Sequence, residues 1–396
     1  MDAPGAQPAE PMHPRRYDVD ALRAGAFAVL MLTHIAMVYV EAPWHVKSSH
    51  SFAALTPALW LVTRWRMGLI FMLSGIASAF LLGERPCRQF VRERSWRLLA
   101  PFAFGVLVLL PVQPYAEAVR NGVIEPDFLR FLYDYWCLRA WPEGAFSITS
   151  RLPLRAPDRH FFGVTFNHLW YLLYLWLYSV ALASIVRALR SSRGARLGQG
   201  LSRLRGQASL WLPLPALLAS AVWLEPRFPL TYNFVYDLHR NVVFFTLFVF
   251  GYAIARSPRF WQRVRSLRFC SLACAILLGA IAVGLDGTAA WQRVLVMLYT
   301  WTVLLAILGW GNAVLNRPFP WLPWANACVF PWYLIHQSAI VLMAYWLVPL
   351  EFAAPLELAL ILAGTLLSCL SITVLAQRVG WLRPWLGMKG ARRAQP

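Results

Sequence analysis

The chain has 396 residues, of which 59% are hydrophobic and only 14% are charged, and its formal net charge is +19. A soluble domain carries about 25% charged residues, so this composition excludes an ordinary soluble protein and indicates a membrane protein. The basic residues are scattered between apolar segments and form no single patch. This pattern argues against nucleic acid as a partner, and it favours the lipid bilayer and an anionic ligand.

Ten apolar segments predict an all-α, polytopic membrane protein with about ten transmembrane helices. They lie at residues 21–41, 57–82, 98–116, 168–187, 208–224, 240–256, 269–285, 291–314, 325–348 and 356–377. In the orientation with a cytoplasmic N-terminus, Lys and Arg in the inside segments outnumber those in the outside segments about three to one, so we expect both termini in the cytoplasm. We expect no cleavable signal peptide, because the N-terminus is polar and Pro-rich.

The segments divide the chain into one membrane domain and two tails. We expect a disordered cytoplasmic tail at residues 1–19, the membrane domain at 20–378 and a second cytoplasmic tail at 379–396. A large outside loop at 117–167 is rich in Pro, Trp, Tyr and charge, and its length favours a lid or a binding surface over a plain connector. Residues 188–207 predict a flexible, basic hinge.

The first apolar segment carries Arg23 at its start and His34 eleven residues later. Eleven helical steps make about three turns, so both side chains share one face, and the rise between them is roughly 16 Å. Arg23 is therefore predicted at a membrane surface and His34 near the bilayer midplane. An ionisable residue at that depth is a functional-site hypothesis, and the alternative is a histidine that is only hydrogen-bonded between helices.

A cluster of arginines precedes the third apolar segment. It includes Arg88, Arg94 and Arg97, and the spacing of three between the last two places their guanidinium groups close together on a helix. Arginine binds phosphate through paired hydrogen bonds, so the cluster predicts a site for an anionic ligand. The alternative is an ordinary inside loop that contacts lipid headgroups.

Other polar side chains lie inside apolar segments. Arg66 is available either to a polar substrate or to a salt bridge, and Ser74-Gly75 on the same segment permits close helix packing. His336 lies about eleven residues into the ninth segment, at a depth similar to that of His34, and is either structural or functional. His168 opens the fourth segment, where hydrogen bonding at the interface and catalysis are equally consistent with the sequence. We assign no role to His45, His50, His160 or His239.

Several common sites are missing from the sequence. No HxxH, HExxH or His-Asp pairing occurs within one predicted helix, so we expect no metal site. The chain also has no phosphate-binding Gly-rich loop and no Gly-x-Ser-x-Gly motif of serine hydrolases.

Taken together, these motifs resemble the acyltransferase 3 family of multi-spanning membrane acyltransferases, over residues 17–378. Arg23 and His34 match its Arg-x10-His motif, and Arg94 and Arg97 match its Arg-x-x-Arg motif. The chain looks most like the glucan-modifying branch, the glucans biosynthesis protein C group. The segments that carry this second likeness are Trp44-His45-Val46, Arg66-Met67 with Ser74-Gly75, His168-Leu-Trp170 and residues 332–337.

The resemblance implies an O-acyltransferase of the bacterial inner membrane. Its donor would be acyl-CoA, with an acetyl or succinyl group, and its acceptor a hydroxyl of an extracytoplasmic carbohydrate such as a periplasmic glucan. No permanently bound cofactor is expected, because acyl-CoA acts as a co-substrate. The alternative is a transporter or flippase for an anionic glycolipid or an exported glycan, although the internal repeats and broken helices common in transporters are not evident in the sequence.

Under this reading each site residue receives a role. His34 and Arg23 are catalytic, and His34 serves either as a general base or as a transiently acylated nucleophile. The anionic donor is bound by Arg94, Arg97 and Arg88. The residues expected to contact the substrate are Arg66, His168, His336 and Trp170.

Overall fold

The computed structural model describes residues 15–139, 141, 145–146, 166–191, 210–228, 234–285 and 289–388. None of these residues forms a β-strand, which confirms the all-α prediction. The α-helices are α1 (Tyr17–Ala36), α2 (Leu55–Glu84), α3 (Cys87–Phe104), α4 (Val112–Arg120), α5 (Phe128–Trp136), α6 (Trp170–Arg190), α8 (Leu214–Ala219), α9 (Leu238–Ile254), α10 (Pro258–Ser266), α11 (Arg268–Val283), α12 (Ala290–Trp310), α13 (Leu322–Leu347) and α14 (Ala354–Arg378). The residues outside the described ranges include 1–14 of the first predicted tail, 140, 142–144 and 147–165 of the outside loop, 192–207 of the hinge and 389–396 of the second tail.

Seven helical segments of the described chain are long and apolar enough to cross a membrane, and the chain is therefore a multi-pass membrane protein. They are Tyr17–Ala36, Leu55–Gly83, Cys87–Arg120, Asn167–Arg190, Ala290–Leu315, Leu322–Leu350 and Ala354–Arg378. The bent pair α9 and α10, with an angle of 111° between the two helices, makes an eighth if it counts as one span. The remaining predicted segments correspond to the shorter apolar helices Leu214–Leu224 and Arg268–Val283. The total of ten spans and the side of each terminus stay predictions.

The arginine cluster lies on a helix. α3 begins at Cys87, eleven residues before the predicted start of the third segment, and Arg88, Arg94 and Arg97 all belong to it. Arg, Gln, Glu and Leu are good helix formers, and Pro86 immediately precedes the first turn, where its missing N–H costs nothing. The apolar window found from sequence therefore marked only the apolar part of a longer helix.

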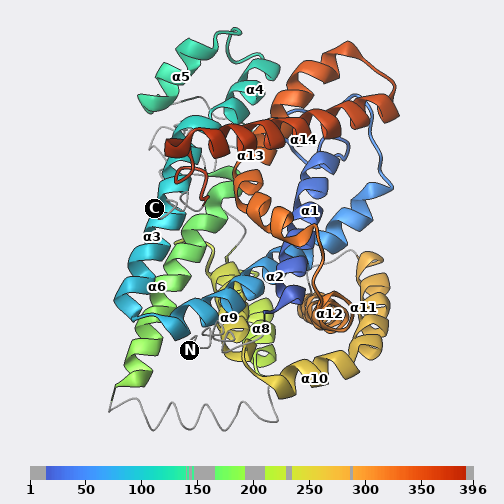
Figure 1. Cartoon of the computed structure of the whole chain (residues 1–396). Coiled ribbons are helices and arrows are strands. Elements are labelled where there is room, and N and C mark those ends of the chain that lie inside the picture. Colours follow the sequence, from blue (N-terminus) through green and yellow to red (C-terminus); the bar gives the residue numbers. More distant parts are fainter. Residues whose placement is uncertain are drawn as a thin grey trace, which may run out of the picture.

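Short helices lie at both ends of the bundle (Figure 1). α4 and α5 lie at one end, and α10 lies at the opposite end. α10 is amphipathic: Phe260, Trp261 and Val264 are buried while its arginines are exposed, as expected of a helix lying along a membrane surface. Arg16 places its guanidinium 3.7 Å from the Trp261 ring centre and pairs with the buried carboxylate of Asp18 at 2.6 Å. These contacts anchor the start of α1, and so the position of Arg23 on it.

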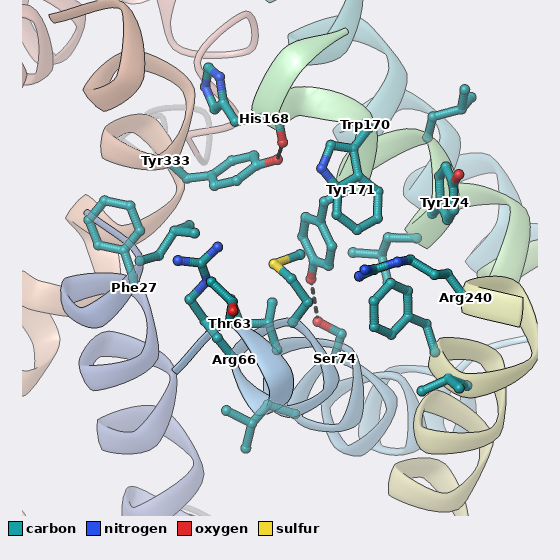
Figure 2. Close-up of a pocket in the computed structure, with 18 of the residues that line it drawn as sticks. Phe27, Thr63, Arg66, Ser74, His168, Trp170, Tyr171, Tyr174, Arg240 and Tyr333 are labelled. Carbon is teal, nitrogen blue, oxygen red and sulfur yellow. Dashed lines mark hydrogen bonds between the residues drawn. The ribbon is translucent and has the colours of Figure 1, made fainter. Parts of the chain in front are cut away.

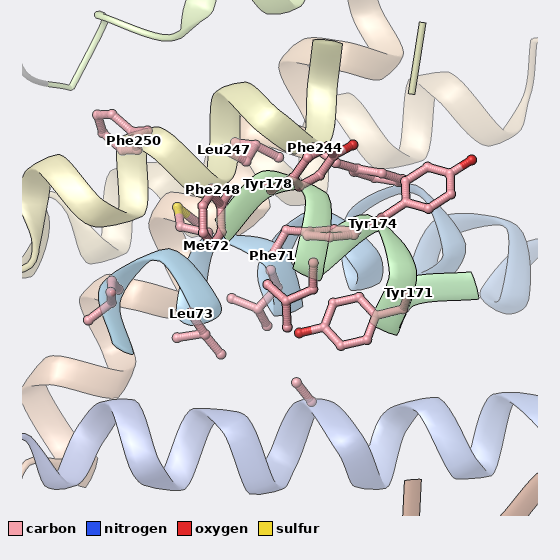
Figure 3. Packing of buried hydrophobic residues seen from close by; sticks show 14 of the residues in the cluster. Phe71, Met72, Leu73, Tyr171, Tyr174, Tyr178, Phe244, Leu247, Phe248 and Phe250 are labelled. Atoms are coloured by element: carbon pink, nitrogen blue, oxygen red, sulfur yellow. The ribbon is translucent and has the colours of Figure 1, made fainter. Parts of the chain in front are cut away.

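Two glycines allow α2 and α9 to pack at close range. A Cβ atom added at Gly75 would lie 1.9 Å from the carbonyl oxygen of Phe248, and one added at Gly251 would lie 2.1 Å from that of Met72. The expectation of close packing at Ser74-Gly75 is therefore confirmed. Around this contact, aromatic and aliphatic side chains of α2, α6 and α9 form the main apolar core, as Figure 3 shows for Phe71, Tyr178 and Phe248.

We predict that Gly75→Ala or Gly251→Ala destabilises the protein by about 1–3 kcal/mol, because a methyl group cannot fit against backbone atoms unless the two helices separate. The measurement is the melting temperature of the purified protein in detergent. Gly25→Ala is the control, since a Cβ atom at Gly25 has no neighbour within 4 Å. An unchanged melting temperature in both test variants would contradict this account of the α2–α9 contact.

Candidate functional site

A cavity of about 1040 Å³ lies within the helix bundle. Its wall includes His34 together with three arginines, Arg23, Arg94 and Arg97. Figure 2 shows other parts of the wall, with Arg66, His168 and Tyr333 on one side and Trp170, Tyr174 and Arg240 on the other. The predicted imidazole therefore faces the same hollow as the predicted anion-binding cluster.

The three arginines come from two helices and lie within electrostatic range of one another. Arg23 interacts with both Arg94 and Arg97, although they are more than 70 residues apart in sequence. Arg94 bridges two helices: its Nε donates to Ser179 at 3.3 Å and its guanidinium also donates to Ser78 at 3.4 Å. Arg97 is exposed, and no described atom forms a hydrogen bond with its guanidinium. This end of the cavity thus presents surplus positive charge suited to a phosphate-bearing ligand.

Arg23 is held in place by polar neighbours. Its guanidinium donates to the side-chain oxygen of Asn326 at 2.6 Å and to Asp20 at 3.3 Å. Asn326 belongs to α13 and also lines the cavity. A hydrogen bond therefore joins α1 to α13 at Arg23. A second contact joins the same two helices at His34.

At that second point of contact, His34 of α1 meets His336 of α13. The His34 Nδ1 and His336 Nε2 atoms are 2.9 Å apart. His336 is fully buried, and its Nδ1 lies 2.9 Å from the carbonyl oxygen of Tyr333. The structure brings together the two histidines that sequence placed at similar depth, with His336 behind His34 and outside the cavity wall.

These contacts determine where the protons reside. A carbonyl oxygen only accepts hydrogen bonds, so the His336 Nδ1 must carry the proton that it donates to Tyr333. In the neutral ring its Nε2 is then an acceptor, and the His34 Nδ1 must donate to it. The His34 Nε2 is left unprotonated. His34 therefore has the tautomer that a general base or a nucleophile requires.

A loop between α1 and α2 covers His34. The Trp44 ring stacks on the His34 ring with 5.5 Å between their centres, and Trp44 also lines the cavity. Lys47 fastens this loop to the end of α1 by donating to the carbonyl oxygens of Met37, at 2.7 Å, and Val40. Burial lowers the pKa of Lys47.

Of the remaining predicted site residues, Arg66, His168 and Trp170 line the cavity and Arg88 does not. Arg66 lies within electrostatic range of both His34 and His336. The His168 Nε2 donates to the carbonyl oxygen of Leu334 at 3.3 Å. Arg88 is exposed on α3, away from the described wall.

One buried cluster of polar side chains was not predicted from the sequence. His45 received no role, but it is buried and its Nδ1 donates to the buried carboxylate of Glu117 at 2.7 Å. The network continues to the cavity wall, because Asn167 donates to Gln113 at 2.6 Å and lies 3.3 Å from the His45 Nε2. The Trp44-His45-Val46 motif pointed to this position, but its partner is 72 residues away. Local sequence therefore carried no signal for the pair.

In the part of the chain that the structure describes, no group of three or more His, Cys, Asp or Glu residues is placed to hold a metal ion. The polar groups of the cavity wall are imidazole, guanidinium, hydroxyl, indole and amide groups and the carboxylate of Glu225. Ser74 and Tyr171, whose hydroxyl oxygens are 2.6 Å apart (Figure 2), contribute two of these hydroxyls to the wall.

Comparison with known proteins gives a family and distant relatives. Residues 16–374 match the family described as an acyltransferase domain, the acyltransferase 3 family. Glucans biosynthesis protein C of Escherichia coli (strain K12) is 24% identical over 178 residues, which cover 45% of this chain and 40% of that protein. The protein of the same name from Shigella dysenteriae serotype 1 is 24% identical over 184 residues, with the same shares covered. The match thus spans less than half the length of these relatives. No solved structure matches.

We predict that diethylpyrocarbonate modifies His34 more than about tenfold faster than His336 or His45, because a buried imidazole reacts only after local opening. His34 lines the cavity and has an unprotonated nitrogen, whereas the other two rings are buried behind the wall. Peptide mass spectrometry of the folded protein in detergent measures the three rates. Equal rates in the folded protein would contradict the accessibility assigned to His34, and the detergent-unfolded protein provides the reference.

Proposed function

The chain belongs to the acyltransferase 3 family, and from that premise we propose that it moves an acyl group from acyl-CoA to a hydroxyl of an extracytoplasmic carbohydrate. The acyl group is acetyl or succinyl, the acceptor is a glycan such as a periplasmic glucan, and the location is the bacterial inner membrane. The names of its relatives support glucan as the acceptor. The observation that carries the proposal is the single cavity shared by His34 and the three arginines.

In this proposal the arginines bind the donor. CoA carries phosphate groups, and guanidinium groups hold phosphate through paired, charge-assisted hydrogen bonds. Arg97 is the residue best placed to form them, because its side chain is exposed and lines the cavity. Arg94 positions the site by joining α3 to α2 and α6, and Arg23 adds charge from α1. Arg88 is left out of the proposed site because it does not line the cavity.

His34 acts as the general base. Its Nε2 takes the proton from the acceptor hydroxyl while that oxygen attacks the carbonyl carbon of the thioester. A C–O bond forms, the C–S bond breaks, and the proton on His34 passes to the departing CoA sulfur. Imidazole suits this exchange because its ordinary pKa lies near physiological pH.

Two neighbours assist the base. His336 holds His34 in the required tautomer by accepting from its Nδ1, so His336 acts as a positioning residue. Arg66 lines the cavity within electrostatic range of His34, where its positive charge stabilises the oxygen that becomes negative during the attack.

We predict that His34→Gln lowers the rate of acyl transfer by roughly 10²–10⁴-fold, the usual contribution of a general base. The measurement is the transfer of radiolabelled acetyl or succinyl groups from acyl-CoA to glycan in membrane vesicles, with protein amounts matched by immunoblot. His50→Gln is the control, because His50 contacts the carbonyl oxygen of Phe352 and does not line the cavity. Normal transfer by His34→Gln would overturn the role. A trapped acyl-imidazole on His34 would replace the general base by a covalent relay.

We predict that Arg97→Gln raises the KM for acyl-CoA by roughly tenfold to a hundredfold with a much smaller effect on kcat, because a charge-assisted contact to phosphate is lost. Arg88→Gln is the matched control, with the same change of charge on the same helix but outside the cavity wall. The comparison uses initial rates at varied acyl-CoA concentration in vesicles. Equal KM values for the two variants would argue against donor binding at Arg97.

A further inference from the structure

A second group of arginines lines the cavity far from the donor site. Arg64 lies in the first half of α2, whereas Arg94 of α3 donates to Ser78 in the second half of α2. The fourteen helical steps from Arg64 to Ser78 span about 21 Å, compared with a hydrocarbon core of roughly 30 Å. The two arginine groups therefore face opposite ends of one cavity.

Three separate helices supply this second group. Arg64 belongs to α2, Arg240 to the first turn of α9 and Arg293 to the first turn of α12. All three line the cavity and are partly buried. Arg64 also packs on Trp60, with 4.3 Å from its guanidinium carbon to the ring centre. Charged residues between membrane helices commonly mark a substrate or ion pathway.

Acidic residues balance this charge only in part. Among the described residues that line the cavity, seven are arginines, and Glu225 is the one acidic side chain. Glu225 lies within electrostatic range of Arg64, which also faces the like charge of Arg240. A nearby carboxylate, Asp237, is buried and accepts a hydrogen bond from Tyr174 at 3.2 Å. Positive charge is therefore in excess along the described wall.

The second group can be reached from two hollows. A smaller cavity of about 240 Å³ shares Arg64, Arg293 and Glu225 with the large one. On the large-cavity side, Figure 2 shows Arg240 beside Trp170 and Tyr174. Trp170, Tyr174 and Phe244 form an aromatic cluster, with 4.9 Å between the first two ring centres and 5.9 Å from Trp170 to Phe244. A ligand there would meet aromatic surface on one side and guanidinium groups on the other.

We propose that Arg64, Arg240 and Arg293 form a second oxyanion site, which binds a carboxylate or phosphate at the end of the cavity opposite the CoA-binding arginines. Arginine forks pair with both groups through parallel N–H···O bonds. The oxyanion belongs either to the acceptor glycan or to the far end of a dicarboxylic acyl group. This inference rests on the proposed function for the identity of the ligand, but not for the existence of the site.

The test measures binding without turnover, with the full chain in lipid nanodiscs. One pair of probes is a neutral glucose oligosaccharide and the same oligosaccharide oxidised at one end to a uronic acid. A second pair is acetyl-CoA and malonyl-CoA, which differ by one carboxylate. Isothermal titration compares wild type with Arg64→Gln, Arg240→Gln and Arg240→Lys. Arg227→Gln is the control, because Arg227 is exposed, contacts the carbonyl oxygen of Trp223 and does not line either cavity.

In wild type we expect the anionic member of one pair to bind roughly tenfold to a hundredfold more tightly, with the preference falling as salt is raised. Arg240→Gln and Arg64→Gln remove the preference, Arg240→Lys keeps part of it, and Arg227→Gln leaves it intact. A preference within the oligosaccharide pair assigns the oxyanion to the acceptor, and one within the CoA pair assigns it to the acyl group.

The proposal is overturned if neither pair shows a preference in wild type, or if the preference survives both Gln substitutions. It is also overturned if Arg227→Gln removes the preference as fully as Arg240→Gln does. These results leave the role of His34 untouched, because no acyl transfer is measured. Conversely, loss of transfer in His34→Gln says nothing about this site.

Discussion

The site depends on one hydrogen bond between two imidazoles inside a membrane protein. In water a histidine exchanges between tautomers and protonation states, but His34 and His336 meet at 2.9 Å with His336 buried and bonded to a backbone carbonyl. Because that carbonyl can only accept, the direction of each bond in the series is determined. The backbone of α13 thus controls which nitrogen of His34 is basic, although the two residues are 302 positions apart.

The same constraint explains why some buried polar groups of the bundle are joined in connected sets. A buried polar group without a partner is costly, and inside a membrane no bulk water supplies one. The His45–Glu117 pair and the Gln113 amide form one such set behind the cavity. Its contact with Asn167 reaches the cavity wall, so it braces that wall next to the loop that places Trp44 over His34. Polar contacts in this protein therefore serve packing and site geometry together.

Close backbone approach supplies the rigid part of the frame. α2 carries Arg64 and Arg66, while α9 carries Arg240, and the contact between the two helices at Gly75 and Gly251 leaves no space for a side chain. A fixed α2–α9 distance fixes the separation of the guanidinium groups. The glycines therefore help to position the arginine side chains that lie elsewhere on the same two helices. Small residues allow such close helix contacts in many membrane proteins.

The amino-acid sequence by itself determined the helical class, the apolar segments and the placement of Arg23 and His34 on the same helix face. These features depend on composition and on local periodicity, and both can be read from a short stretch of sequence. The predicted start of the third helix was wrong by eleven residues. Hydropathy detects the apolar part of a helix but does not detect a polar extension made of good helix formers. The likeness to the acyltransferase 3 family came from order and spacing of motifs along the chain, and the match over residues 16–374 confirms it.

Only the tertiary structure decided which distant residues meet. The bond from His34 to His336, the burial of His45 with Glu117 and the exclusion of Arg88 from the cavity wall depend on how helices rotate and pack against each other. The gathering of Arg64, Arg240 and Arg293 from three helices has the same origin. No local sequence pattern encodes such contacts, because the buried face of each helix depends on how the neighbouring helices pack against it.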